Sequence, residues 1–185
     1  RQRQMCIRDR LNDCHESLTE LSRMSLDSLQ NYKGMGPAKA VTVLAACELG
    51  RRRSMERASQ LRMDNAKAIA DYFRPMLQDK AHEECHLMLL RNNLTFMSTV
   101  RVSEGGLTAS VVDVRQVLRE AIMRQCTAMV FCHNHPSGTL TPSKQDQDLT
   151  HRLVQACRAV DIKLLDHVIV STQGYYSFLE AGTLG

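Results

Sequence analysis

The second half of the chain alternates short apolar runs with segments of helical periodicity. Runs at 82–90 and 127–132 are short enough for buried strands. A helix is predicted near 113–125, and a second helix begins at Pro142-Ser143, with an apolar face of Leu149, Leu153, Val154 and Cys157. The tail 164–182 predicts a strand, a Gln-Gly turn and a second strand. This order predicts an α+β or three-layer α/β unit.

The first 77 residues have a helical pattern instead. Ser25 has the character of an N-cap, and Pro37 occupies the first position of a longer helix that reaches residue 53. A polar stretch at 54–77, ending near Pro75, is predicted to be a linker helix. The pattern therefore divides the chain into a helical module at 11–53, a linker at 54–77 and a mixed domain at 78–185.

Composition agrees with one ordinary domain and a small one. The chain has 185 residues, of which 43% are hydrophobic. Its seven cysteines are odd in number and scattered within apolar stretches, which is typical of reduced thiols in a cytoplasmic protein. The sequence contains no signal peptide and no apolar run of membrane-spanning length. We expect a cytoplasmic location and no membrane partner.

Two histidines and an aspartate near 133–146 have the pattern of a metal site. His133 and His135 follow the strand at 127–132, so alternation places both side chains on one side. The turn at 136–138 leads to the next helix, whose first turn can aim Asp146 at the histidines. Two imidazoles and a carboxylate are a ligand set of catalytic zinc, with one position left for water.

The same residues have simpler interpretations. Ser143-x-x-Asp146 is also close to a helix-capping pattern, and histidines near a turn are often only solvated. A zinc nucleobase deaminase would need His-x-Glu and Pro-Cys-x-x-Cys, which this sequence lacks. A two-metal nuclease would need further carboxylates. The metal site is favoured, and a nuclease stays open as the less supported alternative.

A family resemblance strengthens the metal interpretation. His133, His135, Ser143 and Asp146 match the JAMM motif of MPN/JAB metalloproteases. The segment HNHPSGTLTPSKQD, with SEGGLTASVVDVRQVL before it and LLDHVIV after it, resembles the RadC family of bacterial JAB-domain proteins, from about Leu11 to the C-terminus. The resemblance implies a JAB/MPN domain with cytidine-deaminase-like three-layer architecture. It also implies that RadC-like chains begin further upstream, so the helical module is expected to be truncated.

The resemblance also implies the roles of the site residues. One Zn²⁺ per chain would be held by His133, His135 and Asp146, and Ser143 would stabilise the oxyanion. A glutamate from 82–90 would be the base. Glu83 stands at the motif position, with Cys85 where the family has an aromatic residue, and Glu84 is the alternative.

Strand alternation separates the two acids, because Glu83 shares a face with Cys85 while Glu84 shares the other with His86. Glu104, before two glycines, is a third acid that is better suited to a turn. Asp166-His167 has two interpretations, as support behind the ligands or as an ordinary polar pair at a strand end.

The N-terminal module has a signal of its own. Helix, Gly-x-Gly turn and helix resemble the helix-hairpin-helix motif that precedes the JAB domain in RadC proteins. This implies contacts to a nucleic-acid backbone from Lys33, Gly34, Gly36 and Lys39. A plain packing module is the alternative, since the net charge is only +4.

Two function classes follow. The first is a zinc metallopeptidase or isopeptidase-like hydrolase that acts on a peptide or protein. The second is a DNA-associated repair or recombination protein, in which the hairpin binds DNA and the JAB domain is a nuclease or is not catalytic. The sequence does not name the bond that is cut.

Overall fold

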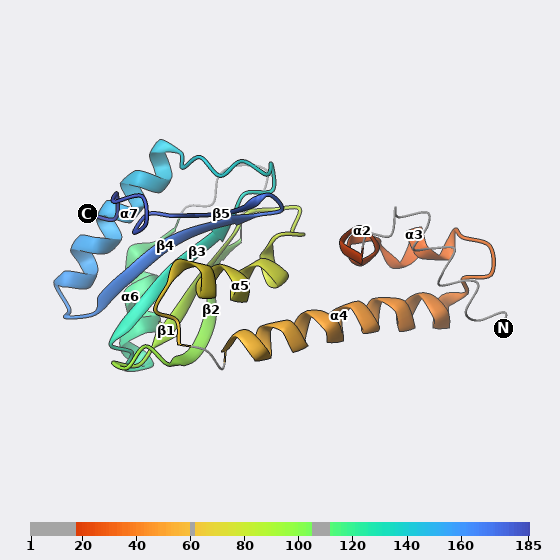
Figure 1. Ribbon diagram of the computed structural model, residues 1–185, viewed down its shortest axis with the longest axis horizontal. Helices are drawn as coiled ribbons and strands as arrows, with labels where there is room; N and C mark the ends of the chain where they lie inside the picture. Colours follow the sequence, from red (N-terminus) through yellow and green to blue (C-terminus); the bar gives the residue numbers. More distant parts are fainter. Residues whose placement is uncertain (1–17, 60–61, 105–111) are drawn as a thin grey trace. The chain divides into compact units, whose positions relative to one another are not determined.

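The structure is a computed structural model that describes residues 18–59, 62–104 and 112–185 (Figure 1). The chain divides into two compact units, residues 1–54 and 55–185, and each is described here by itself. The expectations for residues 11–17 and 105–111 lie outside the described residues. Within the described ranges, no helix is long and apolar enough to cross a membrane.

The first unit is helical and begins its helices where the sequence predicts. Ser25 is the N-cap of the second helix, and its side chain accepts a hydrogen bond from the Ser28 amide at 3.1 Å. Pro37 is the first residue of the third helix. The helices are α2 (Leu18–Arg23), α3 (Leu26–Gln30) and α4 (Pro37–Ser59). Their small core consists of Leu21, Leu29, Met35 and Ala40.

The second unit contains a five-stranded sheet in the order β2-β1-β3-β4-β5 (Figure 1). β3 and β4 are parallel, while the other neighbours are antiparallel. Ser171 pairs with Gly174 in the β4–β5 hairpin, which confirms the hairpin predicted for the tail. The strands are β1 (Glu84–Leu90), β2 (Phe96–Glu104), β3 (Ala128–Asn134), β4 (Lys163–Ser171) and β5 (Gly174–Ser177).

Helices cover both faces of this sheet. Successive strand residues point to opposite faces, so each strand contributes to two apolar cores. On one face, α5 packs Phe73 and Leu77 against Met88 and Val130. On the other face, α6 and α7 pack against residues such as Phe131. The three helices are α5 (Ala66–Leu77), α6 (Val114–Met123) and α7 (Lys144–Arg158). The predicted mixed fold with three layers is confirmed.

The segment 54–77 differs from the single linker helix that was expected. α4 ends at Ser59, Arg62 forms an isolated bridge with Thr95, and α5 begins only after its N-cap Asn65. The side chain of Asn65 accepts a hydrogen bond from the Ala68 amide at 2.9 Å. α5 buries an apolar face and continues through Pro75. It is therefore a layer of the fold, and its exposed polar face concealed this in the sequence.

Candidate metal centre

The two histidines of the motif converge at the end of β3. His133 is the sixth residue of the strand, and the amide of His135 extends the β3–β4 ladder by donating to the Val170 carbonyl at 3.1 Å. Residues two apart on an extended chain point to one side. Their Nε2 atoms lie 3.0 Å apart, and the rings are 1% and 13% exposed for His133 and His135. The predicted convergence of the histidines is present.

A turn after the strand orients His135. Gly138 has φ of +85°, a left-handed conformation that favours glycine, and its amide donates to the His135 carbonyl at 3.0 Å. The turn brings the Thr139 carbonyl to 2.9 Å from His135 Nδ1. A carbonyl can only accept, so Nδ1 carries the hydrogen. In the neutral ring, Nε2 therefore keeps its lone pair and faces His133.

The start of α7 supplies the carboxylate. Asp146 Oδ1 lies 3.2 Å from His133 Nε2, and Oδ2 lies 3.6 Å from His135 Nε2. Ser143 is the N-cap and forms a capping box with Asp146, because the Asp146 amide donates to Ser143 Oγ at 3.2 Å and the Ser143 amide donates to Asp146 Oδ2 at 2.7 Å. The Ser143 hydroxyl also donates to Oδ2 at 2.7 Å. The capping pattern and the ligand cluster are thus the same structure. Ser143 holds the carboxylate, and its role toward an oxyanion stays a prediction.

Contacts among the three side chains shift the pKa values of Asp146 and His135. Burial alone would raise the pKa of Asp146, but the neighbouring imidazoles of His133 and His135 outweigh it and lower that pKa far below its ordinary value of 3.8. Burial alone would lower the pKa of His135, but its contacts with Asp146 and with the Thr139 carbonyl raise that pKa above 6.5. Both shifts share one cause, the contact between the Asp146 carboxylate and the imidazoles, and both favour the ionised carboxylate.

The cluster fits a tetrahedral metal ion. Nε2 of His133, Nε2 of His135 and a carboxylate oxygen of Asp146 all lie within 4.8 Å of one another. Ligands at about 2.1 Å from a tetrahedral ion are roughly 3.4 Å from each other. The two Nε2 atoms are 3.0 Å apart, Asp146 Oδ1 is 3.2 Å from His133 Nε2, and the other carboxylate oxygen, Oδ2, is 3.6 Å from His135 Nε2. These separations lie around that value. The donor atoms and their spacing therefore suit a metal ion.

Glu83 lies beside this cluster. Its Oε1 is 3.9 Å from His133 Nε2, and its side chain is 32% exposed. Asn134 fixes the backbone on both sides of Glu83, because its amide donates to the His82 carbonyl at 3.1 Å and its oxygen accepts from the Glu84 amide at 2.8 Å. The role of Asn134 was not predicted from the sequence, where its position between the two histidines was the one available signal.

Glu84 points to the opposite face of the sheet. Its carboxylate lies 2.9 Å from Lys80 Nζ and 3.0 Å from His86 Nε2. Burial would raise the pKa of Glu84, but the bonds to Lys80 and His86 outweigh it and lower that pKa. Glu104, the third acid, pairs with Arg101 at 2.7 Å. Of the three acids, Glu83 alone is brought to the histidines.

The pair Asp166-His167 is split between two surroundings. Asp166 accepts hydrogen bonds from the Ser177 hydroxyl at 2.6 Å and the Leu179 amide at 3.0 Å. His167 is fully buried behind the ligands, with Nε2 at 2.9 Å from His133 Nδ1 and Nδ1 at 2.6 Å from Thr150 Oγ1. Burial and the neighbouring His133 lower the pKa of His167. His167 thus supports a ligand, while Asp166 supports the β4–β5 hairpin.

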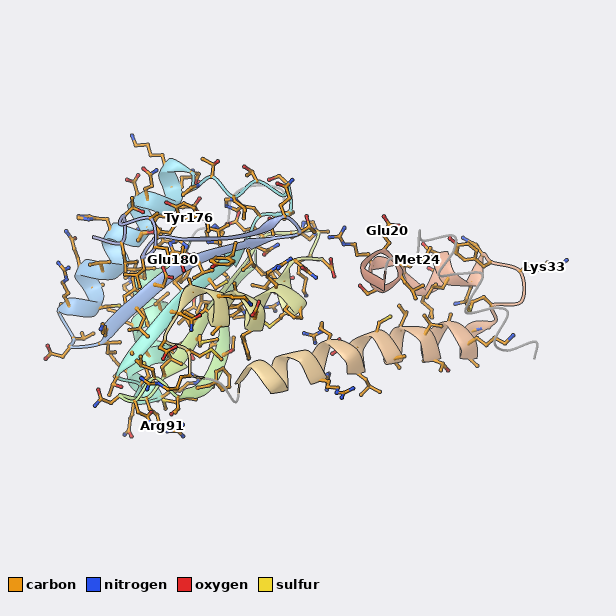
Figure 2. All side chains as sticks on the ribbon, in the orientation of Figure 1. Glu20, Met24, Lys33, Arg91, Tyr176 and Glu180 are labelled. Carbon is orange, nitrogen blue, oxygen red and sulfur yellow. The ribbon has the colours of Figure 1, made fainter. Side chains whose placement is uncertain are left out.

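The hairpin residues lie in the other unit. Gly34 has φ of +82°, as a tight turn between α3 and α4 requires. Lys39 Nζ donates to the Gly34 carbonyl at 2.7 Å, so these two residues are brought together. Lys33 is exposed and extends outward from the turn (Figure 2). Gly36 is also exposed, with no atom within 4 Å of where a Cβ would lie.

Comparison with known proteins agrees with this arrangement. Residues 63–183 match the family model of the RadC-like JAB domain. The chain belongs to the RadC family of JAB-domain proteins. The match begins just before α5, which agrees with α5 being a layer of the RadC domain.

Curated relatives extend over most of the chain. A UPF0758 protein of Flavobacterium johnsoniae is 37% identical over 90% of this chain and 73% of its own length. Those of Symbiobacterium thermophilum and Trichlorobacter lovleyi are 42% and 38% identical, over 82% and 91% of this chain and 65% and 74% of their own lengths. This RadC-family chain therefore spans between 65% and 74% of the length of these relatives.

Proposed function

We propose that this chain is a zinc-dependent hydrolase of the JAMM type, of the metallopeptidase or isopeptidase kind. The observation that carries the proposal is the cluster of His133, His135 and Asp146 with Glu83 at 3.9 Å from His133. A structural zinc site would use four protein ligands, whereas this site offers three and a nearby carboxylate. That arrangement suits a site that activates water.

Zinc is the metal that these donors favour. Two imidazole nitrogens and one carboxylate oxygen are a common catalytic set for zinc, and calcium or magnesium would prefer oxygen donors throughout. A bound zinc ion would lower the pKa of a water molecule toward 7 and polarise the substrate carbonyl. We propose one Zn²⁺ per chain at this position.

The protein's own side chains would then handle the proton and the developing charge. Glu83 would take a proton from the attacking water and pass it to the leaving amine, which is general acid–base catalysis. Its partial exposure leaves it open to a substrate that enters from solvent. Ser143 would hold Asp146 and, by turning its hydroxyl, would donate a hydrogen bond to the oxyanion. Asn134 would keep Glu83 in place.

The proposed substrate is a peptide or a protein. A carboxylate that serves as both base and acid suits an amine leaving group, so we propose a peptide or protein substrate. We also propose that the protein works in the reducing cytoplasm, because the cysteines in the described residues, Cys47, Cys85, Cys126, Cys132 and Cys157, are all free.

DNA association is a second candidate function. The turn between α3 and α4, with Gly34 in a left-handed conformation and exposed Lys33 and Lys39 on either side, supports a nucleic-acid contact. This function would make the chain a repair or recombination protein. Retention on duplex DNA that weakens steeply with salt, together with weaker retention and a shallower salt dependence in Lys33→Glu, would support it.

Zinc content tests the main proposal. The purified chain should contain about one zinc per molecule, and His135→Ala and Asp146→Ala should contain little. His151→Ala and Asp148→Ala are matched controls, because both residues are exposed on α7, the helix that also carries Asp146. Equal zinc content in the parent and in both ligand variants would contradict the proposal.

A further inference from the structure

The geometry points to a chain of directed hydrogen bonds that presents the Nε2 lone pair of His133 to the metal. The chain runs from the Asp146 main-chain carbonyl through Thr150 and His167 to His133. Thr150 and His167 are therefore positioning residues. This inference rests on the proposed metal centre and names the residues that prepare one of its ligands.

The direction of the chain is set at Thr150. Its Oγ1 lies 2.6 Å from the Asp146 carbonyl oxygen and 2.6 Å from His167 Nδ1. A carbonyl oxygen can only accept, so the single hydroxyl hydrogen is donated to Asp146. Toward His167 the hydroxyl oxygen must then accept. His167 therefore carries its hydrogen on Nδ1.

The same reasoning passes on to the ligand. A neutral imidazole has one N–H, so Nε2 of His167 accepts, and the 2.9 Å contact is a bond donated by His133 Nδ1. Neutral His133 then has its lone pair on Nε2, which faces His135 Nε2 at 3.0 Å and Asp146 Oδ1 at 3.2 Å. The opposite direction would place a hydrogen in the ligand cluster and remove one ligand.

Packing holds the His167 ring in this orientation. The ring is fully buried, and Phe178 stacks on it with centroids 4.5 Å apart and an interplanar angle of 4°. Phe131 meets it edge-on at 4.9 Å and 82°. Turning the His167 ring about its Cβ–Cγ bond would sweep it through the space that these two aromatic rings occupy. Nδ1 of His167 therefore stays directed at Thr150, and Nε2 stays directed at His133.

The two histidine ligands are oriented by independent devices. His135 donates from Nδ1 to the Thr139 carbonyl in the loop that follows β3. His133 donates from Nδ1 to His167, whose state is set by α7. α7 therefore supplies the Asp146 carboxylate as a ligand and, through its own backbone carbonyl and Thr150, orients a second ligand. Loss of Thr150 should affect His133 and leave the His135 contact intact.

Nitrogen NMR of the full chain tests the direction of the bonds. Long-range ¹H–¹⁵N spectra of the protein, as purified and after chelation, should show His133 and His167 both protonated at Nδ1. In Thr150→Val, the His167 signals should move toward a mixture of the two tautomers, and Thr150→Ser should restore the parent pattern. Protonation of His167 at Nε2 in the parent would overturn the inference.

Zinc affinity tests its consequence. Competition with a chromophoric chelator should show binding about 10–100-fold weaker in Thr150→Val and near the parent value in Thr150→Ser. Ser177→Ala is the matched control, because it removes another buried hydroxyl, which donates to Asp166 and not to the ligand chain. Unchanged affinity in Thr150→Val would overturn the inference.

The outcomes separate this inference from the proposed function. A parent that binds no zinc but has both rings protonated at Nδ1 would overturn the zinc hydrolase and leave the hydrogen-bond chain in place. A parent that binds zinc with His167 protonated at Nε2 would overturn the hydrogen-bond chain and leave the proposed zinc site in place. If Thr150→Val fails to fold, the tautomer pattern of the parent still decides the direction of the bonds.

Discussion

Glu83 and Glu84 are neighbours in sequence, yet they belong to opposite faces of the sheet. Glu83 lies on the side of the histidines, with its side chain 32% exposed and 3.9 Å from His133. Glu84 is buried on the α5 side, where Lys80 and His86 accompany its carboxylate. One residue step along a strand reverses the face. The sheet thereby separates two identical side chains.

The difference shows how a fold can divide reactivity from stability. Glu84 has partners within 3.0 Å that satisfy its charge, so its carboxylate is committed to the structure. Glu83 is held by its backbone instead, through the two hydrogen bonds of Asn134. Its carboxylate stays available for a proton. We expect substitutions of Glu83 to lower activity and substitutions of Glu84 to lower stability.

The largest expected effect is the loss of hydrolysis in Glu83→Gln. The amide cannot take a proton from water, so cleavage should fall by about 10²–10⁴-fold, while zinc content stays at the parent level. Glu84→Gln should retain hydrolysis in its folded fraction. Cleavage of an internally quenched peptide library, with zinc measured on the same samples, checks both. Loss of cleavage in Glu84→Gln alone would reverse the assignment of the base.

Asn134 gives the next largest effect. Asn134→Ala removes both hydrogen bonds around Glu83 and should lower cleavage by roughly tenfold to a hundredfold, because misplacement by about 1 Å is this costly. Zinc affinity should change little, since Asn134 is not a ligand. Asn134→Asp keeps the acceptor for the Glu84 amide but loses the donor to the His82 carbonyl. It should be intermediate, and an Asn134→Ala variant with parent activity would contradict the role.

The sequence predicts the site where its cause is local. His133 and His135 share a side because of strand period, and Asp146 joins them because a capped helix starts three residues earlier. The roles of Asn134 and Thr150 depend on partners 50 and 17 residues away, which no local period reveals. α5 was misjudged for the same reason, because its polar face is visible in sequence while its buried partners lie on distant strands.

For stability the order of the two substitutions should be reversed, with the larger loss in Glu84→Gln. Glu84→Gln removes the carboxylate that Lys80 and His86 contact, and it should lower the free energy of unfolding by roughly 1–3 kcal/mol. The loss is limited because Lys80 is half exposed and can turn to solvent. Glu83→Gln should stay within about 0.5 kcal/mol of the parent. Urea unfolding of the metal-free proteins measures both. Equal losses would show that the two acids are not divided as described.

The smallest expected effect is on acid stability. The folded protein lowers the pKa of Glu84 below 4.5, against the effect of burial, through Lys80 and His86. The unfolded chain therefore binds the proton more tightly, and the stabilisation is complete above pH 4.5 and is lost as the pH falls through the folded pKa. The stability gap between parent and Glu84→Gln should narrow as the pH falls below 4.5.

A His86→Gln background removes the histidine from this contact and leaves Lys80 and Arg101 as the charged neighbours of Glu84. Urea unfolding at several pH values between 7 and 3 then isolates the single carboxylate. A gap that stays constant down to pH 3 would mean that Glu84 is stabilised equally in its neutral form. Glu84 would then stabilise the fold through packing and hydrogen bonding alone. Its charge would no longer distinguish it from Glu83.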